Sequence, residues 1–391
     1  MLFRSAAYAQ TAEAVTSKGI ELLQAGRFSE AEKQFSEALR INPRLIETQN
    51  LKGVALDGEG RHDEARACYR SAIAANDGFA PAHANLALNA IAREKYPLAI
   101  SELRRALKLA PYLENAGDLL YNLALALYRT GGYEASLQTL DRLPVKAHDA
   151  SYHALAAADK RALGRVGEAR ADLEQALKLD PSNASYLYDL AITLIQNGSP
   201  DEAIRRLTSA MDKCDNCAEL HAALGVAYYV TGKNSDAEEH YKTAVRLQPN
   251  APDLRAALGD LYSAAGEYQK ASAEYELASK YDGQNASYLT KQGRNLLKLQ
   301  QPTKAEAAFR KAITLNPADS EAYLSLGKIA NEQGRAADAL GSLEKAVSLQ
   351  PENSTAWYQL ALTYKKSGDT QKSAAALKRF RTLSASAPTN Q

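Results

Sequence analysis

The chain has 391 residues, with 47 Lys and Arg against 46 Asp and Glu, so its formal net charge is only +1. A charge this close to zero lacks the basic excess of proteins that bind nucleic acid independently of sequence, so we expect no nucleic-acid partner. Apolar runs such as residues 119–128 fall well short of the roughly 18 residues that span a bilayer, so we expect no membrane span.

The amino-terminal residues 1–11 are expected to form a leader outside the fold. Residues 7–9 (Ala-Tyr-Ala) have the small-x-small form of a signal-peptidase site, but few residues precede them and Arg4 stands where an apolar core should be. Two interpretations remain open: a disordered leader of a cytoplasmic protein, or the remnant of a longer signal sequence of an exported, periplasmic one. At the other end, residues 384–391 are expected to form a flexible tail.

Between these ends, residues 12–383 carry a repeating pattern of about 34 residues. Shifting residues 218–251 by one period onto residues 252–285 aligns identical residues, among them Gly225 with Gly259. With Ala12 as position 1, the eleven repeats begin at residues 12, 46, 80, 117, 150, 184, 218, 252, 286, 320 and 354. A fixed period of this length indicates one continuous helical array.

Two positions of the repeat always carry a small side chain, and two others carry residues that end helices. Position 8 is Gly or Ala and position 20 is Ala or Ser in every repeat, so two helices can approach closely there. Position 15 is Gly in nine repeats, and position 32 is Pro in six. Glycine closes a helix in a left-handed conformation without steric cost, and proline cannot continue a helix. Each repeat is therefore predicted to be a pair of helices.

This L-G-x2-Y…G…A-x3-Y/F-x2-A…P spacing resembles the tetratricopeptide repeat over nearly the whole chain. The resemblance implies an all-α fold, a right-handed superhelical solenoid of antiparallel helix pairs. Positions 4, 7, 8 and 11 of the first helix and 20, 24, 27 and 28 of the second are expected to form a core shared between neighbouring repeats. The fourth repeat begins three residues late, so we expect either a change of curvature there, up to a hinge, or a harmless insertion.

The resemblance also implies that positions 2, 5, 9, 12 and 13 of the first helices, with 6 at the edge, line a concave groove. In the fourth to seventh repeats these positions carry Tyr121, Leu125, Tyr128, Tyr188, Ile192, Ile195, Val226 and Tyr229. In the ninth to eleventh they carry Lys291, Arg294, Lys298, Lys328 and Lys365. The core stripe does not need these side chains, and aromatic residues are frequent anchors of binding surfaces. We therefore expect a peptide or protein segment to bind beside the tyrosines, with acidic residues reaching the lysines; alternatively, these side chains are solvated or contact neighbouring repeats.

The turn between the sixth and seventh repeats contains the motif Cys214-x-x-Cys217. Such a pair can be a redox site, half of a zinc site or a small disulfide. His221 could add a third ligand, but a structural zinc site needs four ligands and no second C-x-x-C is present, so no metal is expected. We expect an inert turn or a Cys214–Cys217 disulfide, and a disulfide favours export. Cys68 is expected to be an ordinary helix residue.

No catalytic motif is present, since the chain lacks G-x-S-x-G, G-x4-G-K-[ST] and H-E-x-x-H. We therefore expect no enzymatic activity and no cofactor. The sequence favours a scaffold that binds a protein or peptide ligand. The alternatives are a metal- or thiol-dependent module at Cys214, Cys217 and His221, and a polyanion-binding surface formed by the lysines of the last three repeats.

Overall fold

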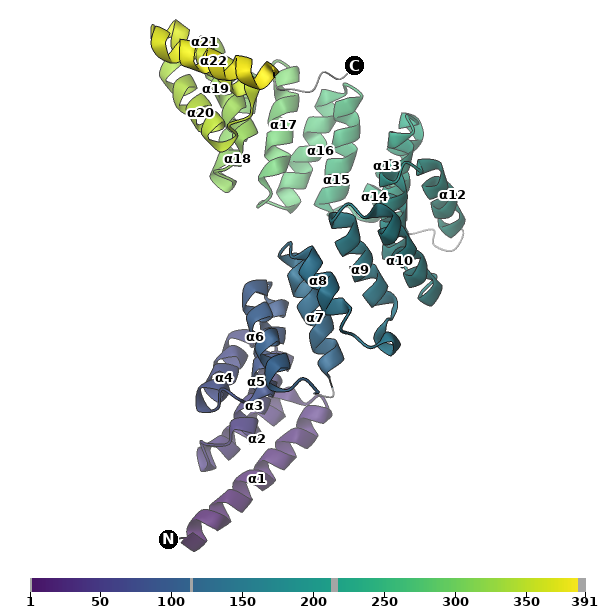
Figure 1. The fold of residues 1–391 in the computed structure, drawn as a ribbon, viewed down its shortest axis with the longest axis vertical. Helices are drawn as coiled ribbons and strands as arrows, with labels where there is room; N and C mark the ends of the chain where they lie inside the picture. Colours follow the sequence, from purple (N-terminus) through teal and green to yellow (C-terminus); the bar gives the residue numbers. More distant parts are fainter. Residues whose placement is uncertain (1, 113–114, 212–216, 386–391) are drawn as a thin grey trace. The chain divides into compact units, whose positions relative to one another are not determined.

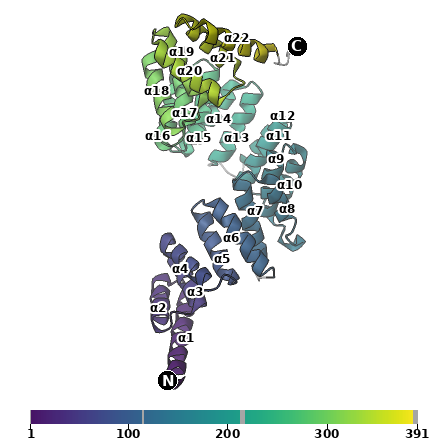
Figure 2. The same ribbon diagram turned by 60° about the vertical axis from the view of Figure 1, so that its left-hand side comes forward.

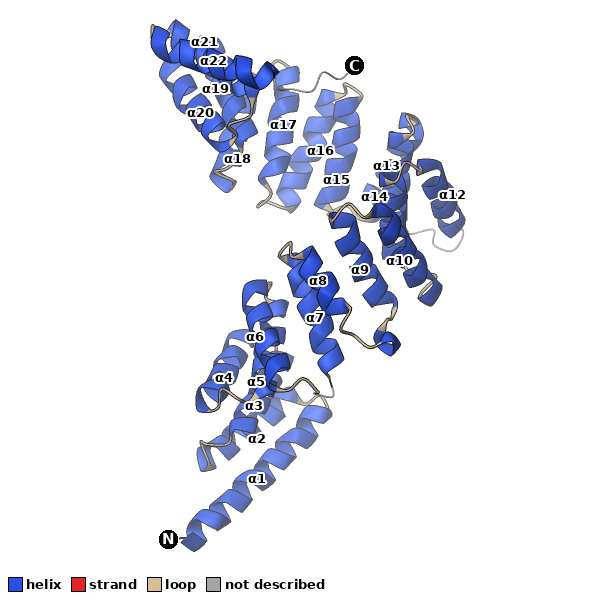
Figure 3. Cartoon of the chain, in the orientation of Figure 1, coloured by secondary structure: helices blue, strands red, loops and turns tan. Residues whose placement is uncertain are grey.

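The computed structural model describes residues 2–112, 115–211 and 217–385, with their side chains from residue 11 onward. Every regular element within these residues is helical, and they contain no strand (Figure 3). The chain divides into two compact units, Met1–Asn197 and Gly198–Gln391. None of the helices described is both long and apolar enough to cross a membrane.

The first unit is a stack of helix pairs followed by one further helix. Its elements are α1 (Leu2–Gln24), α2 (Phe28–Ile41), α3 (Ile46–Gly58), α4 (His62–Ala75), α5 (Ala80–Ala92), α6 (Tyr96–Leu109), α7 (Ala116–Arg129), α8 (Tyr133–Leu140), the 3-10 turn η1 (Val145–Ala147), α9 (Ala150–Ala162), α10 (Val166–Leu179) and α11 (Ala184–Gln196). Each α-helix contacts the next, and the first helices α1, α3, α5 and α7 each also contact the first helix of the following repeat (Figure 1).

The second unit repeats this arrangement, beginning with a single helix. Its elements are α12 (Pro200–Met211), α13 (Ala218–Val230), α14 (Asn234–Leu247), α15 (Pro252–Ala264), α16 (Tyr268–Tyr281), α17 (Ala286–Lys298), α18 (Pro302–Leu315), α19 (Ser320–Glu332), α20 (Ala336–Leu349), α21 (Ser354–Lys366) and α22 (Thr370–Ala385). Consecutive helices again contact each other, an order that Figure 2 shows from a second direction. The predicted all-α architecture of stacked helix pairs is confirmed in both units.

The turns inside the repeats have the predicted left-handed conformation at position 15. All nine glycines there have φ between 71° and 84°. The third and ninth repeats have no glycine at this position, yet Glu94 (φ 55°) and Gln300 (φ 57°) adopt the same conformation. Several first helices begin with an Asn or Asp whose side chain accepts a backbone hydrogen bond, as Asn353 does from Ala356 at 3.0 Å.

The small residue at position 8 packs beneath the side chain at position 24 of the same repeat. A Cβ added at Gly53 would stand 2.4 Å from the Tyr69 ring, and one at Gly259 would stand 2.9 Å from the Tyr275 ring. Carbon atoms do not approach so closely, so these rings require glycine below them. Where position 8 is alanine, position 24 is always leucine. The predicted close approach is thus confirmed. Aromatic side chains at position 24 always lie over glycine, whereas leucine lies over alanine in five repeats and over Gly327 in the tenth.

The fourth repeat departs from the others in its second helix. α8 has only 8 residues, where the neighbouring second helices have 14. Pro144 follows, then η1, while Leu143 remains buried in the core. A hinge at this place stays a prediction. Of the expected leader, residues 2–11 belong to the first part of α1, and of the expected tail only residues 384 and 385 are described.

Candidate partner-binding site

In the first unit, the predicted groove residues of the fourth repeat contribute to the core. Tyr121, Leu125 and Tyr128 are half-buried and pack against the cluster that contains Leu123 and Leu127. Burial is also the main reason why the pKa of Tyr121 is raised. In this repeat the three side chains therefore add to the core, in line with the alternative that they contact neighbouring repeats, and their binding of a partner stays a prediction.

The remaining apolar groove residues fall into both units. Tyr188, Ile192 and Ile195 lie half-buried on α11, the last helix of the first unit. In the second unit, Val226 packs against the core that contains Tyr262, whereas Tyr229 keeps 42% of its surface exposed. Tyr229 is therefore the most accessible of the predicted aromatic contacts.

Three of the five basic groove residues line a hollow on the first-helix face of the second unit. This pocket, which we call the basic pocket, has a volume of about 670 Å³ and is formed by α15, α17 and α19 with the start of α16. Of the predicted residues it contains Arg294, Lys298 and Lys328. The structure thus brings these three together, while Lys291 and Lys365 do not line the pocket.

Existing carboxylates neutralise only part of this positive charge. Arg294 forms an ion pair with Glu321 at 3.1 Å, and Lys291 forms one with Asp260 at 2.8 Å. Lys298 and Lys328 have no ion pair with any residue that the structure describes. Two cations in the basic pocket are therefore available for an anionic ligand.

Asn295 adds a buried polar atom to the same pocket. Its Nδ2 donates to the Lys291 carbonyl at 2.9 Å, and the residue is only 1% exposed. Its Oδ1 is buried and has no hydrogen-bond partner among the described residues. Buried polar atoms are normally hydrogen-bonded, so this oxygen can accept a bond from a ligand N–H once a small side-chain movement exposes it; Asn89 has the same unpartnered oxygen at position 10 of the third repeat. The sequence analysis did not select Asn295; the available signal was an amide at position 10, where several repeats carry Ala, Leu or Ile.

The predicted cysteine site can be followed only in part. Cys217 is the N-cap residue of α13 and is disulfide-bonded, but Cys214 lies outside the described residues, so their pairing stays a prediction. His221 faces His240, with 2.9 Å between the two Nδ1 atoms. No group of three or more metal-binding side chains occurs in the described part of the chain, which does not include Cys214. Cys68 is buried, as expected of an ordinary helix residue.

Comparison with solved structures finds other helical-repeat proteins at low similarity. YrrB, a TPR protein with an unusual peptide-binding site, is 22% identical over 46% of this chain and 93% of its own, with a TM-score of 0.40. MamA is also 22% identical, over 42% of this chain and 91% of its own, with a TM-score of 0.40. A chain of the APC/C hetero-tetramer Cut9–Hcn1 is 16% identical over 90% of this chain and 76% of its own, with a TM-score of 0.48. Similarities this low do not transfer a function, and no curated protein matches the chain.

Family models give a clearer answer. Two models, both described as tetratricopeptide repeat, match residues 16–81, 84–151 and 290–354 in one case and 160–227, 231–294 and 330–382 in the other. The matched segments extend over both units and agree with the helix pairs, the small residues at position 8 and the left-handed turns at position 15. The chain therefore belongs to the tetratricopeptide repeat family.

Proposed function

We propose that this protein is a non-enzymatic scaffold that binds an acidic peptide segment of a partner protein in the basic pocket. Its family and its stacked helix pairs support a role in protein interaction, because solenoids expose extended surfaces to partners. The observation that carries the proposal is the combination of the unpaired Lys298 and Lys328 with the buried, unpartnered oxygen of Asn295 in one hollow.

A peptide matches this combination better than a simple anion does. Its acidic side chain supplies a carboxylate for Lys298 and Lys328, and its backbone supplies an N–H for Asn295 Oδ1. At the pocket wall Glu321 already pairs with Arg294, so a carboxylate of the peptide that lies beside Glu321 would be repelled. This repulsion restricts where along the peptide a second acidic residue can stand. Tyr229, exposed on another first helix of the same unit, is proposed as an additional aromatic contact.

The proposal is tested with an array of 15-residue peptides, in which each Asp- or Glu-containing peptide is paired with its Asn or Gln counterpart. We expect the parent protein to prefer the acidic members. Lys298→Glu combined with Lys328→Glu should weaken their binding roughly tenfold or more, because each reversal replaces attraction by repulsion. Fluorescence polarisation on the selected peptides measures the change.

A matched control separates the pocket from the overall charge of the unit. Lys345 and Lys378 are exposed on the second helices α20 and α22. Their reversal to Glu changes the net charge by the same amount and should leave peptide binding intact. Equal binding of acidic and amide peptides, or equal losses in the two reversed proteins, would contradict the proposal. Heparin binding that both pairs of substitutions weaken equally would favour the polyanion alternative instead.

A further inference from the structure

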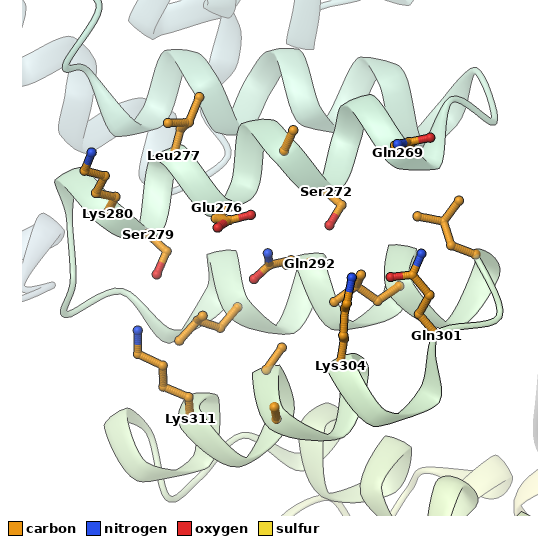
Figure 4. Close-up of a pocket in the computed structure, with 16 residues that line it drawn as sticks. Gln269, Ser272, Glu276, Leu277, Ser279, Lys280, Gln292, Gln301, Lys304 and Lys311 are labelled. Atoms are coloured by element: carbon orange, nitrogen blue, oxygen red, sulfur yellow. The ribbon is translucent and has the colours of Figure 1, made fainter.

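A second hollow lies on a different face of the second unit, where the second helices α16 and α18 form two walls and the first helix α17 forms the floor. We call it the second-helix groove; its volume is about 1180 Å³. Figure 4 shows Ser272, Glu276 and Ser279 on one wall, Gln292 between the walls, and Lys304 and Lys311 on the other wall. The predicted groove residues do not include any residue that lines it.

The groove has a specific cause in the sequence. At five other contacts between repeats, position 28 of one repeat and position 7 of the next are both apolar and share a core cluster, whereas the first contact pairs Leu39 with Lys52. The five apolar pairs are Ile73 with Leu86, Leu107 with Leu123, Val245 with Leu258, Ile313 with Leu326, and Val347 with Leu360. At the contact between the eighth and ninth repeats the pair is Ser279 with Gln292, and both line the groove. The hollow is therefore the space that two branched apolar side chains fill elsewhere.

The opened contact leaves apolar side chains beneath polar groups that are free to bind. Leu289 and Leu296, which are 5% and 8% exposed, form the apolar floor. The side chains of Ser279, Gln292 and Glu276 make no hydrogen bond with any other described residue. A partner that fills this groove can thus bury apolar side chains and also satisfy polar groups.

Charge restricts the kind of partner. Lys280, Lys304 and Lys311 line the groove without an ion pair to any part of the chain that the structure describes, and Glu276 is the single acidic residue in the lining. Lys304 and Lys311 are seven residues apart on α18, which places them on the same side of that helix about 10 Å apart. This spacing matches acidic side chains at positions i and i+7 of a helix that lies along α18.

We propose that the second-helix groove binds an amphipathic helix of a partner protein, with its apolar face on α17 and acidic residues beside Lys304 and Lys311. Two helical walls with an apolar floor form the kind of groove in which an amphipathic helix binds through residues at i, i+3 or i+4 and i+7. α17 is 13 residues long, so about 20 Å of the partner helix can follow it. This inference is independent of the basic pocket, which opens on the other face of α17.

The first test closes the groove by substitution. Ser279→Ile with Gln292→Leu introduces the pair that the next contact already has in Ile313 and Leu326. The probe is a set of 16-residue peptides selected from a phage-displayed random library on the parent protein. We expect apolar and acidic residues at helical spacing among the selected sequences, protection of α16 to α18 from hydrogen exchange on binding, and at least tenfold weaker binding to the closed variant. The melting temperature should stay the same or rise, because apolar side chains replace polar ones at a buried contact.

A second pair of variants tests the proposal without changing the packing. Lys304→Gln with Lys311→Gln should weaken the selected peptides severalfold, whereas Lys345→Gln with Lys378→Gln should not. Unchanged affinity for both the closed variant and the Lys304/Lys311 variant would overturn the proposal. So would a selection in which no peptide protects α16 to α18. Self-association of the parent that the closed variant loses would identify a second copy of the chain as the occupant, and would likewise overturn it.

Discussion

Burial shifts the pKa of Asp159 in the first unit and of the pair His221 and His240 in the second in opposite directions, so we expect opposite responses to pH at these two places. In the first unit, Asp159 on α9 is 0% exposed, and neither carboxylate oxygen has a hydrogen-bond partner among the described residues. In the second, His221 on α13 faces His240 on α14 at 2.9 Å. Burial opposes the charged form in both cases. It raises the pKa of Asp159 to about 7 and lowers the pKa of both histidines.

Polar residues at core positions also differ between the units in whether a ligand can reach them. Asp159 is enclosed, and the adjacent Ser136 hydroxyl, which donates to the Ala124 carbonyl at 2.8 Å, offsets only part of the effect of burial on the pKa of Asp159. Ser279 and Gln292, in the second unit, instead border a groove that a ligand can enter. An enclosed polar group lowers the stability of its own repeat, whereas an open one creates a surface. The repeat plan tolerates both because each contact involves only neighbouring helices.

The largest effect should come from removing the charge at Asp159. Its ordinary pKa is near 3.8, so between about pH 4 and pH 7 the unfolded segment ionises while the folded one remains neutral, and stability falls as the pH rises. Asp159→Asn should abolish this fall and stabilise α8 and α9 by about 2 to 4 kcal/mol above pH 7. The shape fits, because Asn89 and Asn295 already occupy position 10 in other repeats.

Hydrogen exchange of α8 and α9 in the full chain, corrected for the intrinsic pH dependence of exchange, measures this effect. Asp118, exposed at the start of α7, provides the control. Its substitution by Asn should leave the pH dependence unchanged. If the parent and the Asp159→Asn protein show the same loss of protection between pH 5 and pH 8, the ionisation of Asp159 does not weaken this unit.

At the histidine pair, stability should fall as the pH falls, opposite to its dependence at Asp159, and the change in stability should be smaller. The pKa of each histidine is lowered in the fold, chiefly by burial, so stability is complete above about pH 6.5 and is lost as the pH falls through the lowered pKa values. The nearby carboxylates of Glu239 and Asp236 oppose the lowering of the His240 pKa, whereas Arg246 adds to the lowering of the His221 pKa. The Tyr228 ring stacks on His240 with 5.4 Å between the ring centres. Because both rings are partly exposed, we expect a loss of about 1 kcal/mol.

His221→Leu tests this slope, since Leu187 occupies the same position in the preceding repeat. Protection of α13 and α14 between pH 7.5 and pH 5.5 should fall in the parent and stay nearly constant in the variant. His62 in the first unit, which is half-buried and contacts Asp57 at 2.9 Å, can be changed to Gln to show whether loss of another histidine has the same effect on α13 and α14. An equal acid-induced loss in the parent and in the His221→Leu protein would remove the histidine pair as its cause.

The sequence predicts the architecture well because each structural position has a local cause. Small residues at position 8, left-handed residues at position 15 and proline at position 32 each act within one repeat. The core and the binding surfaces are harder to predict because they depend on neighbouring repeats. Tyr121 occupies a groove position and still packs against the core, so the side chains of the adjacent repeat decide its exposure.

The basic pocket and the second-helix groove could be predicted from the sequence only in part. The family resemblance selected Arg294, Lys298 and Lys328 as groove residues, and these three line the basic pocket, but the pocket itself was not predicted. The second-helix groove was not predicted either, although its signal is present: Ser279 and Gln292 interrupt the apolar pattern at positions 28 and 7. The two residues lie in different repeats, and the interruption becomes a groove only when the stacking places them together. Asp159 was missed because position 10, which is buried in nearly every repeat, was not assigned to the core stripe.

The smallest predicted effect concerns a feature that the two units share. Glu94 on α5's C-terminal turn and Gln300 after α17 are the two non-glycine residues at positive φ among those described, one in each unit. A left-handed conformation costs a residue with a Cβ roughly 1 kcal/mol, so Glu94→Gly and Gln300→Gly should each stabilise the adjacent helix pair by about that amount. Urea unfolding of the full chain, followed by hydrogen exchange of the flanking helices, measures it. Because the cause is confined to one backbone turn, the gain should be the same in both units and independent of pH, unlike the effects at Asp159 and at the histidines. A gain in only one unit would show that the side chain of Glu94 or Gln300 has a contact that offsets its strain, and for Gln300 that contact would lie in the basic pocket.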